Sequence, residues 1–300
     1  MATTCHLFLL RPVVGTSLNE PTIFSLRQMD LPDPSATFVC MLQRVETNGI
    51  VFYRSPLLHR AGVLHAFSTR LGGVSQAPFD SMNLGNPSGC AQQDPEESIE
   101  QNYQLLQSAI GFTATNRKWV HQVHGADVQN VSADFINGQK SDAMVSCDAS
   151  VVLSVRTADC VPILIATDNG AVAAVHAGWR GVIANILSAT LTQLADLSHS
   201  THFTAAIGPC IGPDAFEVGD EVAREFQSRF GSLAPIFRAE NGKGHVNLAE
   251  ACRLQLLEKG LPPDQIDVAN ICTANSPQEF FSHRRDFGIS GRMASLIQPK

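Results

Sequence analysis

The chain has 300 residues, of which 44% are hydrophobic and only 16% are charged, and its formal net charge is −7. This composition allows a large buried core and excludes wholesale disorder. The negative charge argues against a protein that coats DNA or RNA, and no apolar run is long enough to span a membrane. The eight cysteines are scattered without paired spacing, which indicates reduced thiols and a cytoplasmic protein.

The N-terminal residues 1–45 are predicted to form a poorly ordered extension. Their apolar stretch around His6 to Leu10 is too short for a secretory signal, and Met41 is a plausible alternative start. No linker rich in proline, glycine or serine follows residue 46. We therefore expect residues 46–300 to form one domain.

Strand and helix patterns are mixed along the rest of the chain. Buried-strand patterns cover residues 63–70, 149–155, 161–167 and 171–176, and shorter ones cover residues 118–123 and 126–131. One helix is expected after Asp94 as its N-cap, with Pro95 as its first residue and Gly111 at its end. Further helices are expected after Gly181, over residues 218–230, and from Asn247 to Gly260. Without a strict βαβ repeat, this mixture predicts an α+β fold.

A tight turn is predicted at Asp168-Asn-Gly170, between two of the buried strands. If this loop has three residues, Pro162 faces His176 and Cys160 faces Gly178. Cys160 and His176 then lie on one face of the sheet as diagonal neighbours, about 7–8 Å apart at the backbone. A two-residue loop would place them on opposite faces, so the prediction depends on the turn type.

Histidine and cysteine side chains near glycines suggest a metal site. Zn²⁺ is bound well by neutral imidazole and thiolate, and a catalytic site uses three protein ligands with one open position. Cys160, His176 and one histidine of the segment His121-Gln-Val-His-Gly125 would supply such a set. His121 and His124 point to opposite faces of an extended segment, so only one of them is expected to bind. Alternatively, each residue is structural, as most single buried cysteines are.

Basic residues stand at a few positions of this otherwise acidic chain. Gly178-Trp-Arg-Gly181 runs into a helix, whose N-terminus together with Arg180 suits an anion, although an ordinary entry turn is equally consistent. Arg70 ends a buried strand, and Ser282-His-Arg-Arg-Asp286 forms a second basic cluster. Each of these two, taken alone, fits a surface salt bridge better than a binding site. No motif of an α/β-hydrolase, a P-loop NTPase or a Rossmann fold is present.

Six segments, taken in this order, resemble one known family. They are Phe67-Ser-Thr-Arg-Leu-Gly-Gly-Val-Ser75, Gln122-Val-His-Gly125, Thr157-Ala-Asp-Cys-Val-Pro162, Val175-His-Ala-Gly-Trp-Arg-Gly181, Ala206-Ile-Gly-Pro-Cys-Ile-Gly212 and Phe281-Ser-His-Arg-Arg-Asp286. The chain resembles the purine nucleoside phosphorylase YfiH/LACC1 family, long labelled the multicopper polyphenol oxidase or laccase-domain family. The resemblance covers roughly residues 46–298, and its third and fourth segments are the most specific.

The resemblance implies a four-layer mixed α/β sandwich, formed by a single catalytic domain, and a zinc site. The matching metal ligands are His124, Cys160 and His176, and copper is the alternative metal. Arg70 matches a basic residue near the metal, and Asn83 lies in a matching Ser-x-Asn-Leu segment. Arg70, Asn83 and Cys160 are therefore the candidate catalytic residues.

The resemblance also implies an activity, which is phosphorolysis of adenosine, inosine, guanosine and S-methyl-5'-thioadenosine, together with deamination of adenosine. The partners would be purine nucleosides and phosphate, not nucleic acid or a membrane. Arg70, with Arg180, would hold phosphate beside an oxocarbenium-like ribose. The chain departs from the family at Asn247 and Cys252, which leaves that segment without an assigned role.

Three other functions are weighed against this one. Cys160 would be the nucleophile of a Cys–His hydrolase that edits cell-wall precursors, with His176 or His124 as its base. A copper-dependent phenol oxidase is disfavoured, because multicopper oxidases need paired His-x-His arrays. A non-catalytic module with a structural zinc is disfavoured, since the sequence offers three ligands and not four.

Overall fold

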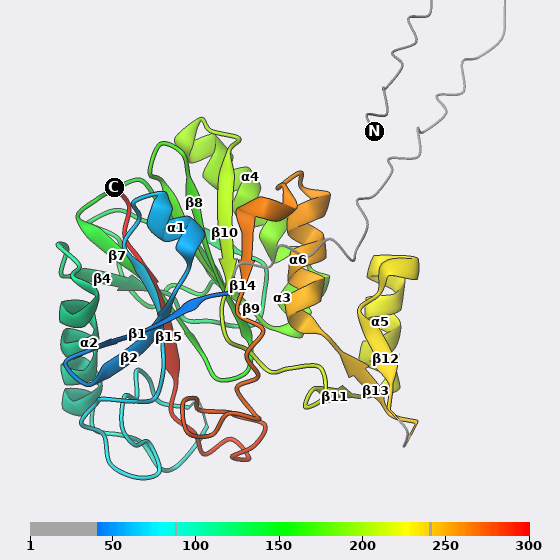
Figure 1. The fold of residues 1–300 in the computed structure, drawn as a ribbon, viewed down its shortest axis with the longest axis horizontal. Helices are drawn as coiled ribbons and strands as arrows, with labels where there is room; N and C mark the ends of the chain where they lie inside the picture. Colours follow the sequence, from blue (N-terminus) through cyan, green and yellow to red (C-terminus); the bar gives the residue numbers. More distant parts are fainter. Residues whose placement is uncertain (1–40, 88, 240–241) are drawn as a thin grey trace, which may run out of the picture. The chain divides into compact units, whose positions relative to one another are not determined.

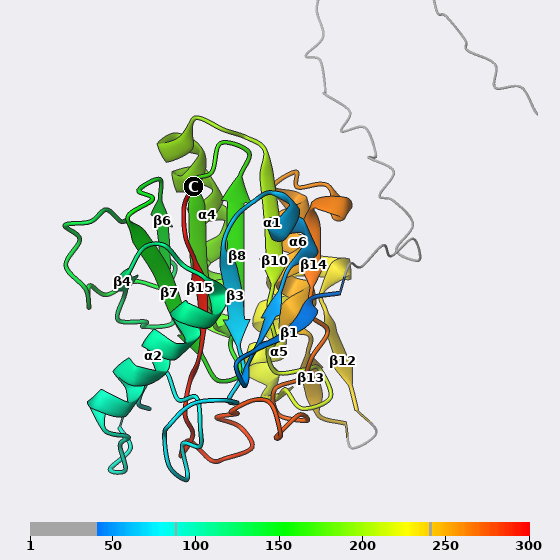
Figure 2. The same cartoon turned by 60° about the vertical axis from the view of Figure 1, so that its left-hand side comes forward.

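Two six-stranded sheets form the centre of the molecule (Figure 1). The computed structural model describes residues 41–87, 89–239 and 242–300. The first sheet contains, in spatial order, β1 (Gln43–Thr47), β2 (Ile50–Arg54), β3 (His65–Ser68), β15 (Met293–Ile297), β7 (Val151–Thr157) and β4 (Asn116–Trp119). Its strands are antiparallel except for the parallel pair β4–β7. Figure 2 shows β15, in red, running between β3 and β7.

The second sheet has a similar mixed arrangement. In spatial order it contains β14 (Ile266–Val268), β10 (Phe203–Ile207), β8 (Val161–Thr167), β9 (Val172–Ala177), β6 (Ala143–Ser146) and β5 (Val128–Asn130). Its two outermost pairs are parallel and the inner pairs are antiparallel. A small third sheet joins β11 (Glu217–Val218), β13 (Gly244–Val246) and β12 (Ile236–Arg238).

Helices cover the outer faces of the two large sheets (Figure 1). The helices are α1 (Pro56–Arg60), α2 (Glu96–Ile110), α3 (Trp179–Ile183), α4 (Ile186–Ser198), α5 (Asp220–Phe230) and α6 (Leu248–Glu258). Tyr103 and Leu106 of α2 pack against the first sheet, and α3, α4 and α6 pack against the second. α5 lies against the small sheet.

Alternating side chains of the strands fill the layer between the two sheets. Leu164 and Ala174 of the second sheet contact Leu153 and Ile297 of the first sheet there. Ile163 and the other side chains on the opposite face of the second sheet pack against the helices. Helix, sheet, sheet and helix are therefore stacked in succession. This arrangement confirms the predicted four-layer α/β sandwich.

The β8–β9 hairpin has the register predicted for a three-residue loop. Pro162 pairs with His176, and the amide of Thr167 donates to the carbonyl of Ala171 at 2.9 Å. Gly170 has a φ of +90°, in the left-handed region that favours glycine. Cys160 and His176 therefore share the face of the sheet that points between the two sheets.

Most predicted helices are confirmed, with two local differences. Gly111 ends α2 with a φ of +84°, and Asn247 caps α6 through the amide of Glu250 at 3.0 Å. The predicted N-cap at Asp94 is wrong, because Pro95 occupies that position and the Asp94 carboxylate accepts hydrogen bonds from other chain segments. The single helix expected after Gly181 is divided in two at Asn185, whose φ is +62°.

The predicted extension falls almost entirely on residues outside the described ones, and it stays a prediction. β1 begins at Gln43, shortly before the expected boundary at residue 46. Among the described residues, no helix combines the length and apolar character needed to cross a membrane.

Candidate metal centre and pocket

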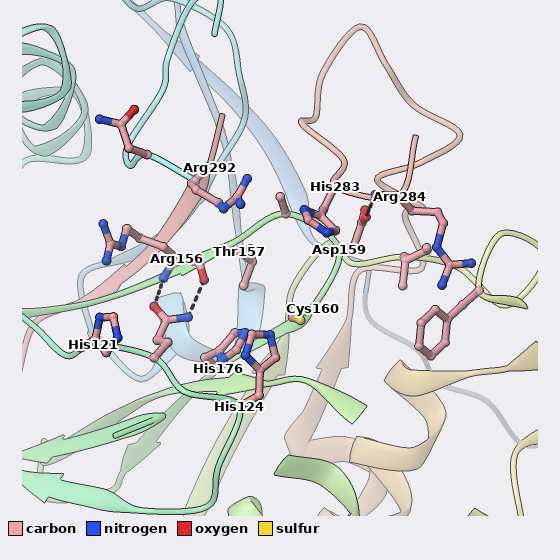
Figure 3. Close-up of a pocket in the computed structure, with 15 residues that line it drawn as sticks. His121, His124, Arg156, Thr157, Asp159, Cys160, His176, His283, Arg284 and Arg292 are labelled. Atoms are coloured by element: carbon pink, nitrogen blue, oxygen red, sulfur yellow. Dashed lines mark hydrogen bonds between the residues drawn. The ribbon is translucent and has the colours of Figure 1, made fainter. Parts of the chain in front are cut away.

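Three side chains from separate segments converge at one end of the sheets (Figure 3). Cys160 directly precedes β8, His176 lies in β9, and His124 lies in the loop between β4 and β5. Their ligand atoms all lie within 4.8 Å of one another. The two imidazole rings meet edge to face, with their centroids 4.9 Å apart. The structure thus brings together the three residues that the sequence proposes as metal ligands.

His124 reaches the centre because the backbone turns sharply at this residue. Its φ is +60°, so His121 and His124 do not lie in one extended segment, contrary to the assumption behind their predicted orientation toward opposite faces. The Asp142 carboxylate holds the turn, since it accepts the amides of Val123 at 3.2 Å, His124 at 2.9 Å and Gly125 at 2.7 Å. His121 lies outside the cluster, although it lines the same pocket.

Asp142 also orients the second histidine of the centre. One carboxylate oxygen lies 2.8 Å from Nδ1 of His176, which directs Nε2 of that ring away from Asp142. Asp142 is fully buried. A carboxylate behind a ligating histidine fixes the tautomer and the ring orientation in many zinc sites. Asp142 belongs to none of the motifs in the sequence, and its place directly before the buried residues of β6 is the only signal that could have pointed to it.

The electrostatics of the cluster favour a charged thiolate. Burial would raise the pKa of the Cys160 thiol, but His176 and His124 lower it to about 6. Burial would also lower the pKa of His176, but Cys160 and Asp142 raise it to about 9. For Asp142, burial opposes ionisation, yet the hydrogen bonds of His176 and Gly125 bring its pKa below the ordinary value. Both shifts favour the thiolate–imidazolium form of the Cys160–His176 pair.

The donor set fits zinc. Two imidazoles and one thiolate are ligands that Zn²⁺ prefers, and three protein ligands leave a fourth position free for water or substrate. The carboxylate of Asp142 behind His176 is the supporting contact expected in such a site. Gly178 provides space for this set, because a Cβ atom there would lie 2.7 Å from Cδ2 of His124 and 3.4 Å from Sγ of Cys160.

The cluster forms one side of a pocket of about 340 Å³, which is large enough for a small metabolite. Two arginines lie elsewhere on its wall, and their positions follow from the pairing of β7 with β15. Arg156 pairs with Ala294 of β15, and Arg292 directly precedes β15, two residues before Ala294, so the two arginines are diagonal neighbours. Figure 3 shows both guanidinium groups on the opposite side of the pocket from the histidine pair.

Neither Arg156 nor Arg292 forms an ion pair with a carboxylate in the described part of the chain. The guanidinium of Arg156 lies over the Trp119 ring at 5.3 Å, and Gly85 leaves it room. Arg292 donates to the carbonyls of Ser290 and Gly291 at 2.7 and 3.0 Å. Burial and repulsion by Arg156 lower the pKa of Arg292. Two neighbouring cations of this kind attract an anion from solution.

A third basic group, with an aromatic ring, completes the pocket. Arg284 lies 5.3 Å from the centroid of Phe216 and donates to the carbonyl of Glu217 at 3.0 Å. His283 lines the pocket next to it, and burial followed by repulsion from Arg292 lowers the pKa of this histidine. In the sequence, Arg284 belongs to the basic cluster of residues 282–286, for which no specific role is predicted.

Two other predicted site residues lie away from the pocket wall. Arg70 forms a salt bridge with Asp80 at 3.3 Å, donates to the carbonyls of Asp80 and Pro277, and stacks on Phe281 at 4.5 Å. Asn83 is fully buried. Its side-chain oxygen accepts the amide of Arg292 at 2.9 Å, so Asn83 supports a pocket residue from behind.

Arg180, the other candidate for anion binding, is not among the lining residues. Its guanidinium packs over the Trp179 ring at 4.3 Å. Cys210, expected to be structural, is buried, and burial raises the pKa of its thiol far above the ordinary value. The arginines that line the pocket are therefore Arg156, Arg284 and Arg292, and Arg180 is not one of them.

Comparisons with known proteins agree on one family. The family model described as "Multi-copper polyphenol oxidoreductase laccase" matches residues 64–300. "Purine nucleoside phosphorylase YfiH" of Escherichia coli is 38% identical over 237 residues, which cover 79% of this chain and 93% of that protein. The crystal structure of YlmD from Geobacillus stearothermophilus matches with a TM-score of 0.77 and 32% identity, covering 87% of this chain and 99% of that one. The structure of a hypothetical protein YfiH from Bacillus licheniformis matches with a TM-score of 0.76 and 25% identity, over 86% and 99% of the two chains.

Proposed function

Because the chain belongs to the multi-copper polyphenol oxidoreductase laccase family and its relatives carry the name purine nucleoside phosphorylase, we propose that it is a zinc-dependent purine nucleoside phosphorylase. One observation supports this most directly. Two arginines that form no ion pair with a carboxylate of the described residues face a His–Cys–His cluster across one pocket. The pocket thus offers an anion site and a metal site to one small substrate.

The arginine pair is the proposed phosphate site. Arg156 and Arg292 offer forked donors, which match phosphate oxygens better than a lysine ammonium does. The packing of Arg156 over Trp119 and the carbonyl contacts of Arg292 hold both groups in place before phosphate arrives. Positioning of this kind lowers the barrier for attack on an oxocarbenium-like ribose without a covalent intermediate.

The remainder of the pocket is proposed to hold the nucleoside. Phe216 supplies an aromatic face, and Arg284 beside it supplies a charged donor. Adenosine, inosine, guanosine and S-methyl-5'-thioadenosine share the purine ring that such a wall would contact. His283 lies near enough to Arg292 for the two charges to interact. Bound phosphate would offset the charge of Arg292 and help His283 to give a proton to the leaving purine.

His124, Cys160 and His176 are the proposed ligands of the metal. When bound, zinc would supply a Lewis acid and a water of lowered pKa, which is the chemistry that deamination of adenosine requires. The protein's part is to hold the three ligands, with Asp142 fixing the turn at His124 and the ring of His176. Copper is the alternative metal, and the laccase label of the family model is the reason to test it.

A Cys–His hydrolase is a second candidate, and one observation favours it. The pKa of Cys160 is lowered to about 6 beside His176, which is the charge state of an active cysteine nucleophile. A thiolate bound to zinc is not a free nucleophile, so metal content decides between the two functions. Stoichiometric zinc together with slow alkylation of Cys160 supports the metal centre.

The proposed function is tested by metal analysis of the purified protein together with a screen of nucleosides with and without phosphate. We expect about one zinc per chain, release of free purine that requires phosphate, and release of ammonia from adenosine that does not. Purine release in the absence of phosphate would contradict phosphorolysis. Copper in place of zinc, with oxidation of phenols, would support the oxidase.

The phosphate site is tested by matched arginine-to-lysine changes. Arg292→Lys should reduce phosphorolysis about 10- to 150-fold, because it removes a charge-assisted contact of ~1.5–3 kcal/mol. Deamination, which uses no phosphate, should change less. Arg70→Lys is the matched control. The sequence predicts Arg70 as a phosphate-binding residue, but in the structure Arg70 forms a salt bridge with Asp80. A selective loss of phosphorolysis in Arg70→Lys and none in Arg292→Lys would reverse the assignment.

A further inference from the structure

Asp159 has a backbone conformation that most residues avoid. Its φ is +94°, in the left-handed half of the map, where a residue with a Cβ atom is strained. The residue lies directly before Cys160 and lines the pocket. It is largely buried, with 8% of its surface exposed. A strained residue at such a place persists only where its contacts hold it there.

The Asp159 carboxylate joins segments that are far apart in the sequence. One oxygen accepts the hydroxyl of Thr273 at 2.7 Å. The other oxygen accepts the hydroxyl of Ser282 at 3.0 Å and the backbone amide of Arg284 at 2.7 Å. The backbone carbonyl of Asp159 accepts the amide of Ile211 at 2.9 Å. Ile211 and Arg284 line the pocket, and Ser282 directly precedes His283, which also lines it.

The turn that Asp159 holds carries two pocket side chains. His283 lies between Ser282 and Arg284, the two residues of this turn that donate to the carboxylate. Arg285 also braces the turn, since it pairs with Asp286 and donates to the carbonyl of Thr273, outside the turn. In Figure 3, Asp159 lies between His283 and Arg284, on the wall of the pocket away from Arg156. Loss of the Asp159 carboxylate would remove these hydrogen bonds, and with them this link between the turn and the segment that carries Cys160.

We propose that Asp159 is a positioning residue, whose carboxylate fixes the 282–284 turn so that His283 and Arg284 face the substrate. Its own oxygens are occupied by three donors, so it holds the wall of the pocket and does not react. The inference rests on the proposed function, because it assigns the turn to nucleoside binding. It is separate from metal binding, since the Asp159 carboxylate contacts none of the three ligand side chains in the described hydrogen bonds.

The test compares Asp159→Asn with two other variants in the full-length zinc-loaded protein. Asn keeps the size of Asp159 but turns an NH₂ group toward donors, so at least one of the three contacts is lost. Thr273→Val removes one donor with little change in shape, and it serves if Asp159→Asn folds poorly. Asp127→Asn is the matched control, because Asp127 is exposed and lies outside the pocket.

Three readouts separate positioning from a general loss of stability. We expect the KM for the nucleoside to rise at least about tenfold in Asp159→Asn, the low end of what a hydrogen bond to a charged group supplies. Zinc content should stay at one per chain, and hydrogen exchange should accelerate at residues 282–286 and not across the sheets. Thr273→Val should show a smaller change in the same direction, and Asp127→Asn none.

Other outcomes overturn the inference. An unchanged KM with unchanged exchange at residues 282–286 would show that the carboxylate does not position the turn. Loss of zinc, or faster exchange throughout the chain, would show that Asp159 is needed for the metal centre or for folding. If the wild-type protein lacks phosphorolysis, the proposed function fails, yet the exchange measurement still tests the link between Asp159 and the turn.

Discussion

At the scale of single residues, Asp142 determines which histidine reaches the centre. Its carboxylate accepts three successive amides of the 123–125 turn and also contacts the ring of His176. These contacts favour the left-handed φ at His124, which directs that ring toward Cys160. His121, three residues earlier, pairs its backbone with Lys140 and stays outside the cluster. One buried carboxylate thus selects between two neighbouring histidines.

Single changes of these histidines should affect metal content very differently. We expect His124→Ala to lose zinc, because only two of the three ligands remain. His121→Ala should keep zinc, since its ring is not part of the ligand cluster. Metal analysis of both variants after the same purification is the measurement, with wild-type protein as the reference. Zinc loss in His121→Ala alone would mean that the turn adopts a different conformation when metal is bound.

At the scale of elements, the start of α3 approaches the loop that carries His124. Gly178 is the N-cap of α3 and has a φ of −74°, which alanine adopts readily. The space is restricted, however, because a Cβ atom would lie 2.7 Å from Cδ2 of His124. The glycine is therefore required by a neighbouring ligand and not by its own backbone.

Gly178→Ala should displace the His124 ring and lower zinc affinity while the fold stays intact. Gly125→Ala is the matched control on the same loop, since its Cβ would meet no atom closer than 3.4 Å. Competition with a coloured chelator measures the affinity, and far-UV circular dichroism reports the fold. Equal affinity in the two alanine variants would show that the loop moves freely to accommodate the methyl group.

A second element-scale feature is the buried His65, which ties β3 to the start of α1. Its Nε2 accepts the amide of Ser55 at 2.8 Å, and its Nδ1 lies 2.9 Å from the carbonyl of Val63. The ring must be neutral to accept a hydrogen bond, and burial lowers its pKa to about 4. Because the pKa in the folded state is depressed, its contribution to stability is present above pH 6.5 and is lost as the pH falls toward 4.

This histidine should therefore make stability dependent on pH in a defined window. Between pH 7 and pH 5 we expect it to reduce the free energy of unfolding by about 2 kcal/mol. His65→Gln keeps an acceptor for Ser55 and should remove that part of the pH dependence. Urea unfolding at the two pH values is the measurement, with the exposed His202→Gln as control. An equal pH dependence in wild type and His65→Gln would mean that the ring does not titrate in this window.

The sequence predicted the elements whose pattern is local. The β8–β9 register followed from one turn, so the neighbourhood of Cys160 and His176 was predictable. The pairing of β7 with β15 depends on strands from distant parts of the chain. No local pattern could therefore bring Arg156 beside Arg292. The prediction of Arg70 rests on a strand end, the residue type and one family motif, and none of these reveals that Asp80 is its partner.

At the scale of the whole molecule, the apolar core is built from many side chains other than the three proposed metal ligands. Three clusters of buried apolar side chains fill the spaces between helices and sheets, around residues such as Phe67, Leu106 and Phe226. None of the three proposed ligands belongs to these clusters. Small zinc domains unfold without their metal, but a chain that buries this much apolar surface does not need the ion to fold.

Removal of zinc should therefore lower the melting temperature without unfolding the protein. A ligand present at about 100 times its Kd adds about 2.7 kcal/mol to stability. For a chain of this size, that corresponds to a decrease in Tm of roughly 5–10 °C on chelation. Calorimetry of holo, chelated and zinc-restored protein measures the shift, and far-UV circular dichroism at 25 °C should stay unchanged. Cys160→Ala should melt like the chelated protein and should not respond to chelator. Loss of the far-UV signal on chelation would instead make the metal a structural ion.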